Sequence, residues 1–199
     1  MTQHADREQQ ARQQGWDALV RTHRDALHRV ALRLTGDPDD AADLVQDTFV
    51  RAFAAWHRFD ARHDGAEAAW LRRIATNLFL DGARRRARLR LDALSPERAD
   101  LLPDRAGAAD RLLDERTFEA DVLAALHRLS PPFRATVVLC DIEGVSHEEA
   151  AAALGVRVGT VRTRLHRARG QLRDALAHRR TPARRRWAAP MPLLHPAIG

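Results

Sequence analysis

The sequence contains no lysine and no tyrosine, and it has a single cysteine, Cys140. One cysteine excludes an internal disulfide, and its place in the apolar run 137–142 favours a buried structural thiol over a reactive one. The chain also lacks an apolar run of the ~20 residues that span a bilayer. Residues 1–15 are polar, without the hydrophobic centre of a signal peptide. These absences predict a cytoplasmic protein.

Sequence patterns of enzymes and of metal sites are missing as well. The nearest approach to a zinc motif is His147-Glu148, but H-E-x-x-H would need a histidine where the chain has Ala151. There is no G-x-S-x-G motif for a nucleophile and no glycine loop that would hold a phosphate. The sequence therefore predicts no catalytic residue, no metal and no cofactor, and an enzyme is the least supported hypothesis.

Arginine is what the chain has in excess. Its 33 basic residues are all arginine and outnumber the 27 acidic residues, which gives a net charge of +6. The lack of lysine and tyrosine together with abundant alanine indicates a GC-rich bacterial genome. The positive charge itself favours a polyanionic partner.

The most informative stretch is 146–173. Ser146 and Glu149 have the spacing of a capping box, which predicts that a helix begins at Ser146. The helix is expected to end at Gly155, the residue type best suited to the left-handed conformation after a helix. A second helix is expected to begin at Val156. Its apolar residues recur at helical spacing and are Val161, Leu165, Ala168, Leu172 and Leu176. This pattern predicts a DNA-reading helix-turn-helix.

The opposite face of the second helix is basic, and no acidic residue occurs between Gly155 and Leu172. We expect Arg162 and Arg167 to read bases, because a guanidinium can donate two hydrogen bonds to guanine. Four further arginines are expected mainly at phosphates: Arg157, Arg164, Arg169 and Arg173. The alternative is a solvated cationic helix without a ligand. The coincidence of capping box, glycine turn, apolar stripe and acid-free face favours DNA binding.

The residues before this stretch predict a second group of helices. One amphipathic helix runs from Trp16 to near Gly36, and the next begins with Asp37 as N-cap and Pro38 at its first position. No strand-like alternation occurs, so the fold class is all-α, with two small helical domains joined by a flexible linker. The expected parts are a disordered N-terminus (1–15), a helical domain (16–90), the linker (91–110), a helix-turn-helix domain (111–178) and a disordered tail (179–199).

Two helices of the first domain have polar outer faces. On the second helix, Phe53 is expected on the inner face, whereas the outer face holds Asp43, Gln46, Asp47 and Val50. On the third helix the residues expected to point outward are Arg72, Arg73, Thr76, Asn77 and Asp81, and five of the seven residues from Arg84 to Arg90 are arginine. These polar residues are either functional or ordinary solvated surface, and the pattern alone leaves both interpretations open.

Three segments resemble bacterial sigma factors of the extracytoplasmic-function group, within the sigma-70 family. They are DPDDAADLVQDTFVRAF (37–53), WLRRIATNLFLDGARRRAR (70–88) and LSPPFRATVVLCDIEGVSHEEAAAALGVRVGTVRTRLHRAR (129–169), of which the last two are most similar to the actinobacterial sigma-E type. The resemblance implies a factor that binds core RNA polymerase, reads the −35 and −10 elements of a promoter, promotes DNA opening and acts in a stress response.

The resemblance also implies roles for individual residues. The contacts to the clamp helices of the polymerase β′ subunit would be Asp43, Leu44, Gln46, Asp47 and Val50. The −10 element would meet Arg73, Thr76, Asn77, Asp81, Arg84 and Arg85, with Asn77 holding a flipped base. The −35 element would meet Arg157, Arg162, Thr163, Arg164, His166, Arg167 and Arg169.

The partners that the resemblance implies are core RNA polymerase, promoter DNA and an anti-sigma factor, with no small-molecule substrate. Anti-sigma factors of such proteins are often membrane-anchored and sometimes contain zinc, so this one would hold the protein at the inner face of the membrane. Nothing in the sequence itself keeps the DNA-binding surfaces inactive, so a partner is expected to supply the inactive state. The resemblance implies that this partner wedges between the two domains and covers their polymerase-binding faces.

Two other functions compete with this interpretation. A stand-alone helix-turn-helix repressor would bind a palindromic site as a dimer and would need no polymerase. An RNA-binding or architectural protein would need aromatic residues interleaved with the arginines, and the basic stretches lack them. Trp70 lies on an apolar stripe and is expected in the core, not as a platform on which a base stacks.

Overall fold

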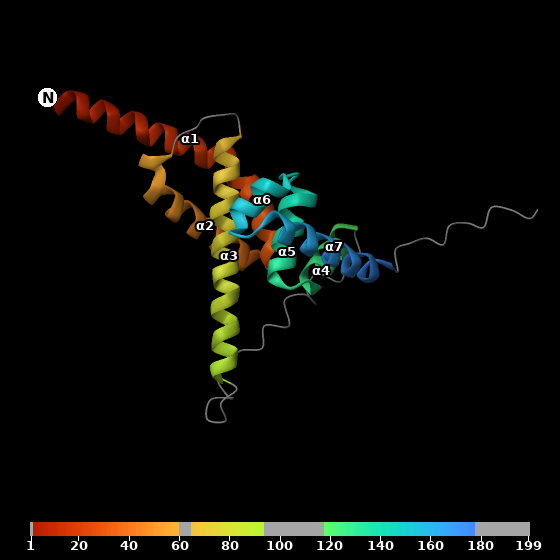
Figure 1. Ribbon diagram of the computed structural model, residues 1–199. Coiled ribbons are helices and arrows are strands. Elements are labelled where there is room, and N and C mark those ends of the chain that lie inside the picture. Colours follow the sequence, from red (N-terminus) through yellow and green to blue (C-terminus); the bar gives the residue numbers. More distant parts are fainter. Residues whose placement is uncertain (1, 60–64, 94–117, 178–199) are drawn as a thin grey trace, which may run out of the picture.

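The computed structural model of the protein describes residues 2–59, 65–93 and 118–177, and every regular element in these ranges is a helix (Figure 1). In chain order they are α1 (Thr2–Thr35), α2 (Pro38–Ala55), the 3₁₀ helix η1 (Trp56–Arg58), α3 (Ala66–Ala93), α4 (Phe118–Arg128), α5 (Pro131–Val137), the π-helix η3 (Val138–Ile142), α6 (His147–Leu154) and α7 (Val158–Ala175). The predicted all-α class is confirmed. Within these ranges, none of the helices combines the length and the apolar character that a membrane crossing requires.

The turn between α1 and α2 forms as the sequence predicts. Gly36 follows α1 with a φ of 73°, in the left-handed region that glycine adopts most easily. The Asp37 carboxylate then accepts hydrogen bonds from the backbone N–H groups of Asp39 and Asp40, at 2.9 and 3.0 Å. Pro38 takes the first helical position, where its missing N–H costs nothing. This turn brings α2 back against α1.

The helices α1, α2 and α3 pack around aliphatic side chains. Leu27, Leu34, Leu44, Leu71 and Phe79 are each no more than 8% exposed. Burial of one such side chain contributes about 1.5–3 kcal/mol to folding. Trp70 is part of this packing, since its ring stacks on Phe59 with centroids 4.5 Å apart, and this supports the interpretation of Trp70 as a core residue.

The helix-turn-helix also forms at the predicted residues. Ser146 Oγ accepts a hydrogen bond from the Glu149 N–H at 3.2 Å, while the Glu149 carboxylate accepts one from the Ser146 N–H at 3.1 Å. Gly155 is left-handed, with a φ of 63°. The second helix, α7, begins at Val158, two residues after the expected start. Its residues Val161, Leu165 and Ala168 are buried as predicted.

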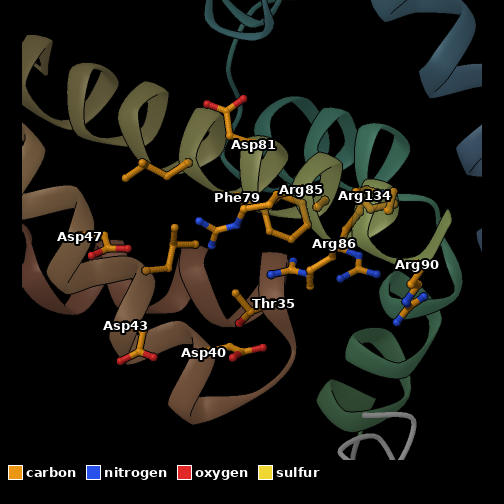
Figure 2. A pocket seen from close by; sticks show the side chains of 16 residues that line it. Thr35, Asp40, Asp43, Asp47, Phe79, Asp81, Arg85, Arg86, Arg90 and Arg134 are labelled. Carbon is orange, nitrogen blue, oxygen red and sulfur yellow. The ribbon is translucent and has the colours of Figure 1, made fainter. Parts of the chain in front are cut away.

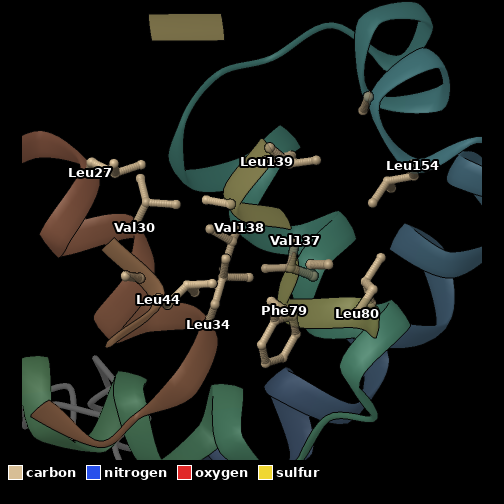
Figure 3. Close-up of a cluster of buried hydrophobic side chains, with 14 of the residues drawn as sticks. Leu27, Val30, Leu34, Leu44, Phe79, Leu80, Val137, Val138, Leu139 and Leu154 are labelled. Atoms are coloured by element: carbon tan, nitrogen blue, oxygen red, sulfur yellow. The ribbon is translucent and has the colours of Figure 1, made fainter. Parts of the chain in front are cut away.

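The two helical groups pack against each other. One continuous buried cluster contains Leu34 and Phe79 of the first group and Val137, Val138 and Leu154 of the second (Figure 3). The sequence predicted two groups of helices, and the structure shows both. Their packing into one core was not predicted.

Some expectations were wrong or fall outside the described residues. The helix α1 includes residues 2–15, which the sequence analysis assigned to the N-terminus before the first helical domain. Phe53 is not an inner residue of α2, since its side chain is 53% exposed. The helix α3 extends to Ala93, into the expected linker. Residues 60–64, the rest of the linker, residues 111–117 at the start of the expected helix-turn-helix domain and the expected tail 179–199 lie outside the residues that the structure describes.

Candidate nucleic-acid interface

The outer face of α7 carries most of the predicted base-reading residues. The side chains of Arg162, His166 and Arg167 are exposed, and they follow one another at spacings of four and one. Thr163 is exposed too, with its hydroxyl donating to the Gly159 carbonyl at 2.9 Å. The guanidinium of Arg162 comes within 3.9 Å of Glu148 on α6, a distance at which a solvent-exposed pair contributes little. These side chains are therefore available to contact base edges in the major groove of a DNA duplex.

The flanking arginines differ in their surroundings. Arg157 is the exposed N-cap residue of α7, and Arg164 is half-buried. Arg169 binds the Asp141 carboxylate through two hydrogen bonds, from Nε at 3.0 Å and from Nη2 at 2.6 Å. Such a bidentate pair fixes the guanidinium in one plane. Arg169 thus joins α7 to the end of η3, and its role as a phosphate contact, which the sequence predicted, stays a prediction.

A shallow groove of about 380 Å³ runs beside α7. Its polar lining comes from two helices and consists of His147, Arg162, His166, Arg169 and Arg173. Three arginines around one hollow make a site that attracts an anion such as a DNA phosphate. His147 was singled out in the sequence only for the zinc motif that it fails to complete. The structure places it at the edge of the basic face.

A second polar surface follows α3. Arg73, Asn77, Asp81 and Arg84 recur at spacings of four, four and three, so they lie along one stripe of the helix. All but the half-buried Asn77 are exposed, and Asp81 accepts a hydrogen bond from Arg84 at 3.0 Å. An amide beside arginines can both donate to and accept from the edge of a base. The structure therefore brings together four of the six residues predicted for the −10 element.

Thr76 is a correction to the sequence analysis. It was predicted to point outward with the −10 residues, but its side chain is fully buried and its hydroxyl donates to the Arg72 carbonyl at 2.8 Å. A threonine hydroxyl in a helix often donates to the carbonyl four residues earlier, so Thr76 needs no partner outside α3 for this donor. In this structure Thr76 is closed to DNA.

The third surface is the outer face of α2. Asp43, Gln46, Asp47 and Val50 are exposed as predicted, with Val50 65% exposed. Leu44 is again a correction, because it is only 8% exposed and belongs to the core. Phe53, which the sequence placed inside, lies three residues after Val50 and extends the same face. Because Phe53 is hydrophobic, the sequence analysis assigned it to the inner face, although its spacing of three residues from Val50 could have indicated the outer face.

A groove of about 990 Å³ separates this acidic face from the arginines of α3. In Figure 2, Asp40, Asp43 and Asp47 lie along one side, and Arg85, Arg86 and Arg90 along the other. Arg85 lines this groove together with Asp81, a member of the Asn77 stripe. The groove has an acidic wall on α2 and, apart from Asp81, a basic wall on α3, so a segment that fits it needs both charges.

Among the residues that the structure describes, no group of three or more histidine, cysteine or carboxylate side chains could hold a metal ion. Cys140 is half-buried on η3, where burial and then the neighbouring Asp141 raise the pKa of its thiol. A raised pKa keeps this thiol protonated and unreactive.

Comparison with known proteins identifies the family. The family Sigma-70 region 2 matches residues 19–89, and Sigma-70, region 4 matches residues 119–172. The chain is 50% identical over 168 residues to the ECF RNA polymerase sigma factor SigE of Mycolicibacterium smegmatis, a match that covers 84% of this chain and 64% of SigE. The chain belongs to the extracytoplasmic-function (ECF) sigma factors. This ECF sigma factor is also 39% identical over 170 residues to the RNA polymerase sigma-E factor of Streptomyces avermitilis, with 85% and 89% of the two chains covered.

Two solved structures resemble the ECF sigma factor described here. One is the sigma factor RpoE in complex with the anti-sigma factor NepR from Bartonella quintana, with a TM-score of 0.62 and 29% identity over 82% of this chain and 97% of that one. The other is CnrH in complex with the cytosolic domain of CnrY, with a TM-score of 0.56 and 33% identity over 83% and 90% of the chains. Sigma factors are transcription initiation factors and not enzymes. The α3 stripe and the α2 face thus belong to region 2 (19–89), and the α7 face to region 4 (119–172).

Proposed function

We propose that this sigma factor binds core RNA polymerase and directs it to promoters in which α7 reads the −35 element and α3 reads the −10 element. The observation that carries the proposal is the presence of two unlike polar surfaces on one chain, the basic face of α7 and the stripe around Asn77 on α3. A dimeric repressor needs a single DNA-reading surface per chain and no region 2. That alternative is not favoured.

The proposed polymerase contact is the outer face of α2. Val50 and Phe53 give it an exposed apolar centre, and Asp43 and Asp47 give it negative charge. Interfaces bury an apolar centre within a polar rim, and complementary charge orients the partner. A basic helical segment with apolar residues fits such a face, and we assign it to the clamp helices of the β′ subunit. Leu44 lies in the core beneath this face.

We also propose an anti-sigma factor as a partner. The two similar solved structures were each determined with an anti-sigma factor or the cytosolic domain of a partner protein. The groove between the acidic face of α2 and the arginines of α3 is large enough to receive a segment of such a partner. An inhibitor bound there would compete with polymerase for Asp43 and Asp47. A membrane-anchored inhibitor would hold the sigma factor at the inner face of the membrane until a stress signal releases it.

Transcription in vitro tests the proposed function. Purified core polymerase is incubated with genomic DNA fragments with and without this protein, and transcript starts are mapped. We expect starts that appear only when the protein is added, each preceded by two conserved elements at a fixed spacing. Sequence-specific binding to a palindrome without polymerase, and no new starts with it, would instead assign the chain to the repressors.

A further inference from the structure

The outer face of α2 combines exposed apolar area with negative charge. Val50 is 65% exposed and Phe53 is 53% exposed, and Asp43 and Asp47 precede them on the same side of the helix. The other large hydrophobic side chain that is exposed among the described residues is Leu89 of α3, which has an arginine on each side in the sequence. Exposed apolar area of this kind often marks an interaction site. Only the α2 patch is flanked by acidic side chains.

The charge of this face is not neutralised within the described part of the chain. Asp43 and Asp47 form no salt bridge with any residue there, and Figure 2 shows both carboxylates along one side of α2. The helix itself carries four aspartates and one arginine, Arg51. A surface with exposed carboxylates beside apolar side chains attracts a segment that is both basic and apolar.

The sequence after α7 contains such a segment. Residues 178–199 follow the last described residue and hold five arginines without any acidic residue. Three of these arginines, at 184–186, stand directly before Trp187, and the next seven residues are all apolar. Contacts to DNA phosphates would need the arginines but not the apolar run. The order of charged and then apolar residues is the same on α2, where the aspartates precede the apolar patch.

The segment is long enough to reach α2. The helix α4 packs against both α7 and α1, and a Cβ at Gly36, in the turn before α2, would overlap the ring of its His127. A helix of 11 residues such as α4 is about 16 Å long. Residues 178–187 can span about 35 Å when extended, roughly twice the length of α4. The chain after α7 can therefore cross α4 and arrive at α2.

The spacing of the charged and apolar groups also agrees. Six residues of helix separate Asp47 from Phe53, which is a rise of about 9 Å. Three residues separate Arg184 from Trp187, which is about 10 Å in an extended chain. A guanidinium at Asp47 therefore leaves the indole ring beside Phe53. That ring would join an existing aromatic cluster, since the ring centroids of Phe53 and Trp16 are 5.1 Å apart.

We propose that residues 184–194 dock on the outer face of α2, with their arginines at Asp43 and Asp47 and the ring of Trp187 against Val50 and Phe53. The docked segment covers the surface that we assign to polymerase, so the chain competes with polymerase for its own α2 face. Docking stands on the match of charge, apolar residues and length, whereas the competition rests on the proposed function.

Disulfide trapping in the full chain tests the docking. Ala54 is exposed on α2 one turn after Val50, and Ala188 lies in the proposed segment. In a chain with Cys140→Ala, we expect the pair Ala54→Cys, Ala188→Cys to close a disulfide under mild oxidation about tenfold faster than the control pair Ala26→Cys, Ala188→Cys. Ala26 is an exposed alanine of α1. The difference is expected because a disulfide requires Cα atoms within about 7 Å of each other.

Two changes in the segment separate charge from packing. The triple variant Arg184→Glu, Arg185→Glu, Arg186→Glu is repelled by the aspartates of α2, and Trp187→Ala loses the apolar contact, so each should lower the trapping rate to that of the control pair. Added salt should also slow trapping, because exposed charges are screened. Equal rates for the two cysteine pairs would overturn the docking. Disulfide-linked dimers in place of the closed monomer would assign the segment to a second copy of the chain and overturn docking within one molecule.

Capture of core polymerase tests the competition. The triple glutamate variant should reach half-maximal capture at a concentration several-fold below that of the wild type, because its α2 face is always free. The control is Arg179→Glu with Arg180→Glu, outside the docked segment, which should stay near the wild type. Circular dichroism should show the same helical content for all of these chains.

The remaining outcomes separate the parts of the proposal. Trapping as expected with unchanged capture would overturn the competition. If trapping is as expected but no form of the protein captures polymerase, the proposed function fails while the docking stands. Equal trapping rates together with a loss of affinity for −35 duplexes in the triple glutamate variant would assign these arginines to DNA phosphates and overturn the proposal.

Discussion

At the scale of single residues, the arginines of α7 divide according to what they contact. Arg162 and Arg167 are exposed on the outer face, and each could make a two-hydrogen-bond contact to a guanine. Replacing either by alanine should cost about 1–3 kcal/mol of discrimination at one base pair of the −35 element. Binding to a set of duplexes with single base-pair changes measures this. An equal loss of affinity on every duplex would show that both residues contact only phosphates.

Arg169 provides the contrast on the same helix. Because its guanidinium binds Asp141 in a bidentate pair that is largely exposed, Arg169→Ala should lower the free energy of unfolding by only about 0.5–1 kcal/mol. DNA affinity should fall evenly across all duplexes. Asp141→Asn should reproduce the effect on stability, and the double variant should show non-additive losses because one contact is removed in each.

Asp47 allows a test of the proposed polymerase contact, since it is exposed on the α2 face while its neighbours Leu44 and Thr48 are buried in the core. Asp47→Arg should abolish capture of core polymerase, because a positive charge is placed against a basic partner. Circular dichroism should show unchanged helical content. The matched variant Asp25→Arg should be captured normally, and normal capture of Asp47→Arg would remove α2 from the polymerase interface.

At the scale of the helix, α3 combines the Asn77 stripe, which we propose as the reader of the −10 element, with a face that packs against α5 and α6 of region 4. Asn77→Ala removes one amide from the stripe and leaves α7 unchanged. We therefore expect wild-type binding to −35 duplexes and fewer open complexes. Permanganate reactivity of thymines in the −10 element measures strand opening. Equal reactivity in the variant and the wild type would assign Asn77 to ordinary surface.

The turns between helices differ in how well they tolerate replacement of glycine by alanine. A Cβ at Gly155 would meet no atom within 4 Å, so Gly155→Ala should cost only the strain of a left-handed alanine, about 1–2 kcal/mol. A Cβ at Gly36 would overlap the ring of His127 as well. Gly36→Ala should therefore lower the melting temperature more than Gly155→Ala. Adding His127→Ala should recover part of the loss, and no recovery would mean that backbone strain alone is responsible.

The helices that the sequence predicted well are those whose ends are encoded locally. At the start of α2, the Asp37 side chain satisfies backbone N–H groups of the first turn, and Pro38 follows at the first position. At the start of α6, Ser146 and Glu149 form a capping box. Three or four residues of sequence therefore suffice to predict where these helices begin. Thr76 and Phe53 could not be placed in this way. Their exposure depends on what lies across from the helix, as it does for Phe53, whose ring centroid is 5.1 Å from that of Trp16. Of the candidate sites, the α7 face needed only local signals, whereas the groove lined by Arg86 and Arg90 needed the tertiary structure.

At the scale of the whole molecule, His127 makes the packed core sensitive to acid. Burial, and then the nearby positive Arg134, lower its pKa from 6.5 to about 4. Among the described residues, no group hydrogen-bonds to its buried Nε2. The folded state therefore favours the neutral ring of His127. The free energy of unfolding that depends on this neutral ring is fully present above the unfolded pKa of 6.5 and is lost as pH falls toward 4.

We therefore expect the free energy of unfolding to fall by about 1 kcal/mol more in the wild type than in His127→Gln as pH is lowered through this range, since partial exposure of the ring reduces the effect. Urea unfolding at a series of pH values measures the difference. Parallel pH profiles for the two proteins would contradict the role of His127.

The contact of Glu143 with Arg33 and Arg72 joins parts of one chain, so its strength does not depend on protein concentration. A contact within one chain is not weakened by dilution, whereas a contact between two separate proteins is. The packing of region 4 on region 2 should therefore be the same at every protein concentration, so that the midpoint of unfolding by urea does not shift when the protein is diluted.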